Sequence, residues 1–321
     1  MGNSLKQMQI RKLVKSGFSS LVIAVPKDWI TRNKLKAGDL IYISDENNKL
    51  TVSTEVKEKA PERTEKVISV DGKPMQIIHR EITSAYMDNY YYVVIKGKEL
   101  KYNIKSIKEI ISDLVALELV DESSEKIVAR SFLNLNDIDI KMLLRRIDNI
   151  LRSMIIDTKE TLNDPKLVRS ILDRDPEINK LNFLIAKILK AAYNNRSLLS
   201  SLKITDMDIL RLWEVNHHLE KIGDRTKNIA ELLPTLKPEH KKKFISLFVK
   251  IEGIYIDAIK SFYNSSQQLS DEVSTRRYSL FADVKEFIKL SKSNTCSQIA
   301  INMFNMISHI NDVSRVVRYL N

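Results

Sequence analysis

From about residue 136 to the C-terminus, apolar residues recur three and four positions apart, the spacing of one face of an α-helix. Two sets of helix-start signals divide this region. Asp164-Pro165 places a capping residue before a proline, and Thr205 with Asp208 makes a capping box. Few glycines interrupt the pattern. We therefore predict a six-helix bundle, with helices over 137–163, from 164–165 onward, from 205 to just before Pro234, and over 238–266, 271–293 and 296–320.

The first 56 residues have a different pattern, in which short apolar and β-branched runs are separated by turn signals. The pattern predicts, in order, a strand over 21–25 ended by Pro26, a short helix over 28–33, a turn over 37–39, and a hairpin with strands over 40–43 and 50–54. A segment of this size buries little apolar surface by itself. We therefore expect it to dimerise.

A segment with mixed helix and strand signals lies between these two regions. Residues 57–66 are strongly charged and are expected to form a linker. Beyond them we predict a helix over 77–87, a strand over 90–95, a helix over 104–114 and a strand over 126–130. The expected fold class is α+β, mostly α. Its predicted domains are a β-rich module over 1–56, a small α/β connector over 67–133 and a helical domain over 136–321.

Composition indicates the expected cellular setting. Apolar residues make up 43% of the 321 residues, which is enough for packed cores. No apolar run approaches the ~20 residues that span a bilayer, and the first 15 residues lack the apolar centre of a secretion signal. The single cysteine, Cys296, fits a reducing compartment. We expect a soluble, cytoplasmic protein without membrane insertion.

The net charge of +11 is concentrated near the N-terminus, where residues 1–45 hold eight lysines and arginines against three aspartates. Cationic side chains suit a polyanionic partner, because neutralising its phosphates releases condensed counterions. Charge alone does not separate nucleic acid from an anionic membrane surface.

Residues 14–29, followed by Leu35-Lys36-Ala37-Gly38-Asp39, resemble the AbrB/SpoVT family. That family's pattern is a strand ending in Pro-Lys, a short helix, then Leu-x-x-Gly-Asp and a hairpin. The resemblance implies an interlocked, swapped-hairpin dimer that binds double-stranded DNA. Carried over by position, it assigns the DNA contacts to Lys6, Arg11, Lys12, Lys15 and Lys27.

Lysine contacts to phosphates give affinity with little base specificity. The alternative to DNA binding is a dimerisation module with a solvated basic face. Phe18-Ser19-Ser20 departs from the Gln-containing stretch that is more common in the family.

The six predicted helices look like a duplicated three-helix unit, with repeats over 136–234 and 238–321. Residues 147–150 are echoed at 251–254, and residues 219–224 are echoed at 307–312. A period of this kind indicates a repeated supersecondary unit.

Leu219-Glu220-Lys221-Ile222-Gly223-Asp224, followed by Asn228-Ile229-Ala230-Glu231, closely resembles the PhoU family signature. Asp175 to Leu181 resembles the acidic motif on that family's preceding helix, and residues 80–86 resemble the connector of archaeal-type phosphate uptake regulators that fuse AbrB-like and PhoU-like domains. The resemblance implies paired three-helix bundles, a role in phosphate signalling, and in several members metal ions between helices.

The spacing of the acidic residues supports a metal site. Glu220 and Asp224 are four positions apart, so they project from one helical face. Asp175 and Asn179 have the same spacing and are expected to face them from the preceding helix. Adjacent carboxylates favour a cation between them. We expect a divalent ion (Mg, Mn, Fe or Zn) at this acidic helix pair.

The sequence departs from the family's acidic motif at two positions. Asn179 stands where the family has a carboxylate. In the second repeat, Ser308 stands at the position that corresponds to Glu220, so only Asp312 remains of that acidic pair. The alternative is structural, with Glu220 paired to Arg225 or a lysine and Asp224 capping or bridging helices. His217 and His218 are helical neighbours that point in different directions, so we expect packed or surface histidines rather than ligands.

These features together predict a DNA-binding transcriptional regulator of phosphate uptake, in which the helical domain senses phosphate status through a metal or a partner. The alternative is a PhoU-like adaptor that contacts a phosphate transporter or signalling protein without binding DNA. We do not expect an enzyme, because the sequence has no nucleophile elbow, no His-Glu-x-x-His and no glycine-rich phosphate loop.

Overall fold

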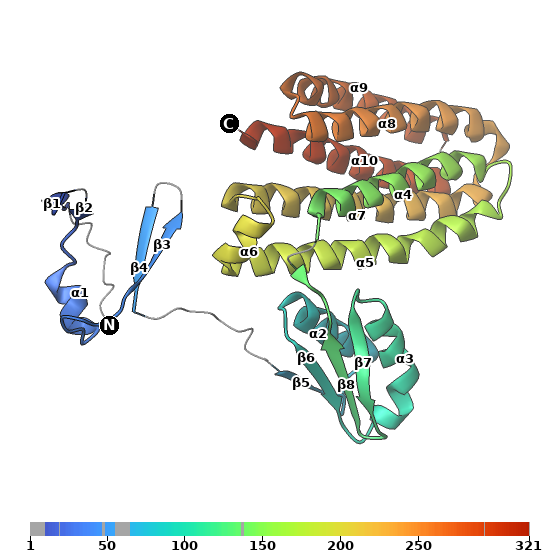
Figure 1. Cartoon of the computed structure of the whole chain (residues 1–321). Coiled ribbons are helices and arrows are strands. Elements are labelled where there is room, and N and C mark those ends of the chain that lie inside the picture. Colours follow the sequence, from blue (N-terminus) through green and yellow to red (C-terminus); the bar gives the residue numbers. More distant parts are fainter. Residues whose placement is uncertain are drawn as a thin grey trace. The chain divides into compact units, whose positions relative to one another are not determined.

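The structure is a computed structural model that describes residues 10–18, 20–46, 49–54, 65–135, 138–291 and 293–320. Its internal contacts divide the chain into two compact units, Met1–Glu62 and Arg63–Asn321 (Figure 1). The predicted division into domains 1–56, 67–133 and 136–321 stays a prediction. Among the described residues, no helix is both long enough and apolar enough to cross a bilayer.

The first unit consists of two short hairpins and one short helix, which are β1 (Val14–Ser16), β2 (Ser20–Val22), α1 (Lys27–Arg32), β3 (Tyr42–Glu46) and β4 (Lys49–Ser53). β1 pairs with β2 and β3 pairs with β4, both antiparallel. The strand predicted over 21–25 is shorter and ends at Val22. The predicted turn is observed: the Lys36 N–H donates to Asp39 Oδ2 (2.7 Å), and Gly38 has φ +95°.

None of the residues of this unit whose side chains the structure describes is buried. Phe18 and Ile10 are almost fully exposed, and Leu21, Leu40 and Ile43 each expose more than half of their surface. An apolar surface of this kind is favourable only if something covers it. The single chain therefore leaves the first unit without a core of its own.

The second unit begins with an α/β part, composed of β5 (Glu65–Ser69), α2 (Met75–Met87), β6 (Tyr92–Lys96), α3 (Leu100–Ser112), β7 (Leu117–Glu122) and β8 (Lys126–Ser131). The sheet has the order β5-β6-β8-β7, in which only β5 and β6 are parallel. α2 and α3 bury Ile78, Ile82 and Ile107 against it. The linker predicted over 57–66 is too long, because β5 already begins at Glu65.

The rest of the second unit is helical, with α4 (Ile140–Glu160), α5 (Leu167–Asn194), α6 (Arg196–Ser201), α7 (Asp206–Leu232), η2 (Leu233–Thr235), α8 (Pro238–Asn264), α9 (Gln267–Ser291), α10 (Asn294–Arg315) and η3 (Val316–Leu320). The capping box predicted at Thr205 and Asp208 is confirmed. α5 begins later than predicted, at Leu167 rather than at Pro165.

The helices form two groups that share one continuous core. α4, α5 and α7 pack on one another, α8, α9 and α10 do the same, and α7 packs along α10 between the groups. Gly223 allows α7 to approach α4 and α5, since a Cβ there would lie 3.1 Å from Ile178 Cδ1 and 3.3 Å from Leu151 Cδ2. α7 and α10 therefore lie at the centre of the helical part (Figure 1).

α5 also packs against α2 and joins the helical part to the α/β part. Lys187 is 2% exposed, donates from Nζ to the Tyr86 carbonyl oxygen (2.8 Å), and lies over the Tyr86 ring. Asn89 Nδ2 donates to the Lys187 carbonyl oxygen (3.1 Å), and an ion pair joins Lys180 to Asp113. The junction therefore contains a buried cation.

Candidate functional site

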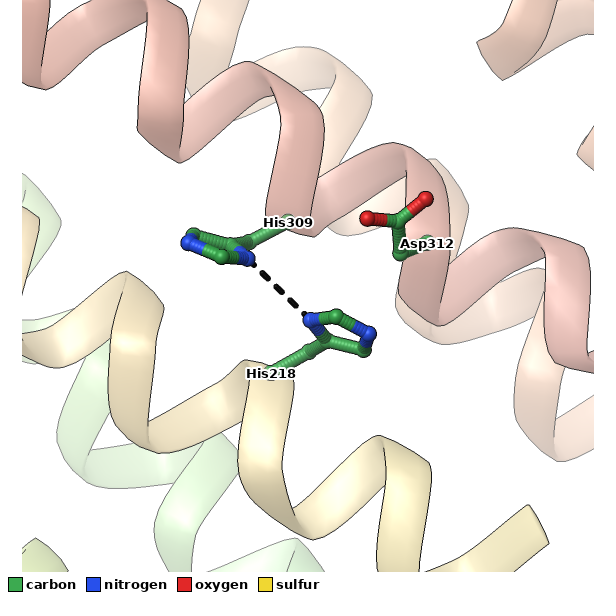
Figure 2. Close-up of side chains that lie close together, drawn as sticks. All are labelled: His218, His309 and Asp312. Carbon is green, nitrogen blue, oxygen red and sulfur yellow. Dashed lines mark hydrogen bonds between the residues drawn. The ribbon is translucent and has the colours of Figure 1, made fainter.

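Two histidines and an aspartate converge where α7 packs on α10. His218 comes from α7, and His309 and Asp312 come from α10 (Figure 2). The two Nδ1 atoms are 3.1 Å apart, and one ligand atom from each of the three residues lies within 4.8 Å of the others. In the described part of the chain, no other group of three or more His, Cys, Asp or Glu residues is close enough to hold one ion.

The helical pattern explains why these side chains meet. On α7, His218 directly precedes Leu219, whose side chain is in the core; on α10, His309 and Asp312 flank the buried Ile310. The three polar residues therefore lie at the edge of the apolar seam and remain half-buried. His309 and Asp312 are three positions apart and share a face.

The electrostatics favour uncharged imidazoles. Burial, followed by the proximity of His218, lowers the pKa of His309 to about 4. Burial also lowers the pKa of His218, although Asp312 opposes the shift. Both rings are therefore neutral near pH 7 and keep a lone pair for a hydrogen bond or an ion.

The donor set fits a first-row transition ion. Two ligand nitrogens that each lie about 2.0–2.1 Å from a tetrahedral ion are about 3.3 Å apart, close to the observed 3.1 Å. Two imidazoles and a carboxylate suit Zn²⁺, Fe²⁺ or Mn²⁺ better than Mg²⁺ or Ca²⁺, which prefer oxygen ligands. Asp312 lies 3.8 Å from Arg315 Nη1, so its competing ion pair is loose.

The acidic residues predicted as ligands lie beside two lysines. Lys227 Nζ is 2.7 Å from Asp175 Oδ2 and 3.6 Å from Asp224 Oδ1, so an ammonium group bridges α5 and α7. Lys221 Nζ is 3.0 Å from Glu220 and 3.2 Å from Asp224.

These contacts correspond to the structural alternative, in which lysines neutralise the carboxylates. Asn179 lies beside Asp175, with its amide nitrogen 3.5 Å from Oδ2. Burial raises the pKa of Glu220 against the opposing hydrogen bond from Lys221. The assignment of Asp175, Asn179, Glu220 and Asp224 as ligands stays a prediction. Asp312, by contrast, lies with the two histidines, and the hydroxyl of Ser308, one turn before it on α10, donates to the Phe304 carbonyl oxygen.

Sequence reasoning expected His218 to be a packed or surface residue and did not single out His309. The two are 91 positions apart, so no local spacing connects them. The only sequence signal was the spacing of His309 and Asp312 on one helical face. His217 is exposed, one of the two placements expected for it.

The residues predicted to contact DNA lie in the first unit. Arg11 and Lys12 precede β1, Lys15 lies in β1 opposite Leu21 of β2, and Lys27 begins α1. All four side chains are exposed. Lys6 lies outside the described residues.

Comparison with known proteins gives two matches. Residues 144–233 match the PhoU domain family, a range that covers α5 and α7 but ends before α8. Among solved structures, the crystal structure of PhoU from Pseudomonas aeruginosa is similar, with 14% identity and a TM-score of 0.46 over 56% of this chain and 90% of that one. A comparison with curated proteins gives no match. The resemblance of residues 1–56 to the AbrB/SpoVT family stays a prediction.

Proposed function

We propose that this chain is a DNA-binding transcriptional regulator of phosphate uptake and phosphate homeostasis. The observation that carries the proposal is the PhoU domain over residues 144–233, in one chain with a cationic, β-rich first unit. The PhoU domain supports the link to phosphate. The first unit supports the link to DNA.

Two features of the first unit support a DNA-binding dimer. Its apolar residues are uncovered in the single chain, so a second copy supplies the missing cover. Dimerisation also doubles the number of exposed cations that one duplex meets, and each neutralised phosphate adds to the affinity by counterion release. Arg11, Lys12 and Lys15 follow one another along one arm and are the main contacts in this proposal.

The sensor in this proposal is the pair of helix groups joined by α7 and α10. A metal ion held by His218, His309 and Asp312 would tie the two groups together and favour one arrangement of the bundle. When bound, the ion supplies a coordination link between α7 and α10. A partner that contacts the same helices could bias the bundle in the same way.

DNA binding is tested with gel shifts on the chain's own upstream DNA, at low and at raised salt. Replacing Arg11, Lys12 and Lys15 with Glu is expected to weaken binding at least ~100-fold and to flatten the salt dependence, because phosphate contacts are lost. The matched control replaces three exposed lysines of the helical part, Lys237, Lys242 and Lys285, with Glu. This control makes the same change in net charge and should bind nearly as well as the wild type.

Absence of binding even at low salt would contradict the regulator and favour the adaptor that contacts a phosphate transporter. An equal loss of DNA affinity in the two triple variants would show that net charge, rather than Arg11, Lys12 and Lys15 in particular, drives binding. The phosphate link is tested by sequencing the DNA recovered with the protein from phosphate-starved and phosphate-replete cells, where the occupied sites should differ.

A further inference from the structure

A pocket of about 320 Å³ opens at one end of the helical part. Residues from the beginnings of α4 and α7, the connection between α6 and α7, the end of α8 and the start of η3 line it. Neither the candidate metal ligands nor the residues predicted to bind DNA line it. It is therefore a separate feature of the molecule.

Cationic side chains dominate the charged lining, which consists of Lys141, Arg145, Lys203 and Arg211 with one carboxylate, Asp208. That carboxylate already has partners, because it accepts hydrogen bonds from the Thr205 N–H (2.9 Å) and hydroxyl (2.7 Å) and pairs with Arg211 (3.1 Å). Within the described ranges, no carboxylate forms an ion pair with Lys141, Arg145 or Lys203. The pocket therefore has an excess of positive charge.

One wall of the pocket is apolar and aromatic, with contributions from Leu212, Phe262 and Tyr263. The Arg145 guanidinium lies over the Tyr263 ring, 5.5 Å from its centroid. Burial raises the pKa of Tyr263 to about 12, so its hydroxyl is neutral near pH 7 and does not oppose an anion.

Asp148, whose charge acts on Tyr263, also has hydrogen-bond partners. Its Oδ1 accepts from the Tyr255 hydroxyl (2.7 Å) and from Arg152 Nε (2.9 Å). Asp148 and Asp208 are therefore both held by neighbouring donors, and Asp139 at the start of α4 accepts from the Met142 N–H (3.1 Å). The N-terminal turns of α4 and α7 add partial positive charge at this end of the bundle, and the C-terminal end of α8 adds partial negative charge, so the helix ends favour an anion by a small margin.

We infer that this pocket binds a small phosphate-bearing anion, whose charged group contacts Arg145, Lys203 and Arg211 and whose remainder packs against Phe262 and Tyr263. Clustered guanidinium and ammonium donors are the groups that recognise phosphate. The volume lies within the range of small-molecule sites and exceeds the volume that a bare phosphate ion fills. This size favours an organic phosphate over the inorganic ion.

Adjacent residues on α4 give a matched pair of variants. Both side chains are exposed, but Arg145 lines the pocket, whereas Arg146 does not and lies 3.7 Å from Glu177. Both substitutions, Arg145→Gln and Arg146→Gln, remove one charge from neighbouring positions of the same helix. Neither side chain is in the core, so both variants are expected to fold, which thermal unfolding checks.

The test is calorimetric titration of the full chain with inorganic phosphate, adenosine monophosphate and adenosine. We expect the monophosphate to bind, inorganic phosphate to bind more weakly, and adenosine not to bind. Arg145→Gln and Lys203→Gln should each weaken binding of the monophosphate roughly ten- to hundred-fold, the effect of losing a hydrogen bond to a charged group. Arg146→Gln should change it less than about two-fold.

Binding of inorganic phosphate as tight as that of the monophosphate, with the same loss in Arg145→Gln, would support the site and identify free phosphate as its ligand. Absence of binding by both phosphates at millimolar concentration would overturn the inference. So would equal losses in Arg145→Gln and Arg146→Gln, because they would show attraction by general surface charge.

Discussion

The two units of this chain contain similar apolar residues but use them differently. In the helical part, Phe244, Ile254 and Ile310 are completely buried in one continuous core. In the first unit, no side chain that the structure describes is buried, and Leu21 and Leu40 remain largely exposed. The apolar pattern of a segment therefore tells which residues need cover, and only the surrounding structure tells where the cover comes from. For the first unit, we expect it to come from a second copy.

The largest expected effect comes from placing a charge on the uncovered surface. In a dimer covered as proposed, Leu21→Asp loses two buried leucine side chains, about 3–6 kcal/mol in total, which weakens dimerisation roughly 10²- to 10⁴-fold. Light scattering across a concentration series measures the change. The thermal transition of the helical part should not move. A wild-type chain that is monomeric at all concentrations would contradict the expectation that a second copy covers the apolar residues of the first unit.

A core substitution in the helical part should lower the free energy of unfolding and leave dimerisation unchanged. Phe244 is 0% exposed, so Phe244→Ala should lower the free energy of unfolding by about 3–5 kcal/mol through lost burial and a cavity. Urea denaturation measures the loss, and the dimerisation constant should be unchanged. Tyr278→Ala, at an exposed aromatic residue, is the control and should cost less than about 0.5 kcal/mol. A shift in oligomeric state with Phe244→Ala would show that the two units are not independent.

Lys187 is a charged residue buried in the second unit, whose buried residues are otherwise mostly apolar. Burial lowers the pKa of Lys187 to about 8 from an ordinary value of 10.5. Between these pH values, the unfolded chain holds a proton that the folded chain has released, so folding stability rises with pH. The cost of burying the charge is fully present below pH 8.

Wild type and Lys187→Met should therefore differ in the slope of unfolding free energy against pH. From pH 8 to 10, wild type should gain stability relative to the variant, approaching about 3 kcal/mol if the whole interval to 10.5 were crossed. Tyrosine ionisation affects both proteins equally, and the lost hydrogen bond to Tyr86 adds a constant offset. Parallel pH profiles would show that Lys187 stays charged or reaches solvent.

The smallest expected effect is the stabilisation by a bound metal ion. It distinguishes a site at His218, His309 and Asp312 from one at the acidic residues of α5 and α7. Zn²⁺ or Co²⁺ at about 100 times its dissociation constant should stabilise wild type by about 2.7 kcal/mol. His309→Ala should abolish this shift and the bound metal detected by elemental analysis. Glu220→Ala with Asp224→Ala should leave both intact. The reverse result would assign the metal to the acidic helix pair.

Local signals predicted local structure well. The helix expected over 77–87 is α2, and the capping box at Thr205 forms as expected, because both depend on neighbours within one turn. The strand over 21–25 is shorter than its β-branched run suggests, since few neighbours in one chain pair with it.

The sequence pattern did not predict which side chains contact each other between different helices. The spacing of Glu220 and Asp224 correctly places both on α7, but it carries no information about Lys227 reaching Asp175 on α5. The pairing of His218 with His309 likewise depends on how α7 packs against α10. Helical periodicity identifies the faces that pack, and the final docking of the helices determines which polar groups meet at their edges.

The distance between His218 and His309 along the chain has a consequence for biosynthesis. A ribosome releases the PhoU-matched segment, residues 144–233, well before α10 emerges. The early half of the bundle then offers one imidazole without its counterpart, and a nascent chain cannot complete this ligand set. Metal capture at this position would thus require that α10 has been made and has packed against α7, and products truncated before α10 would lack it.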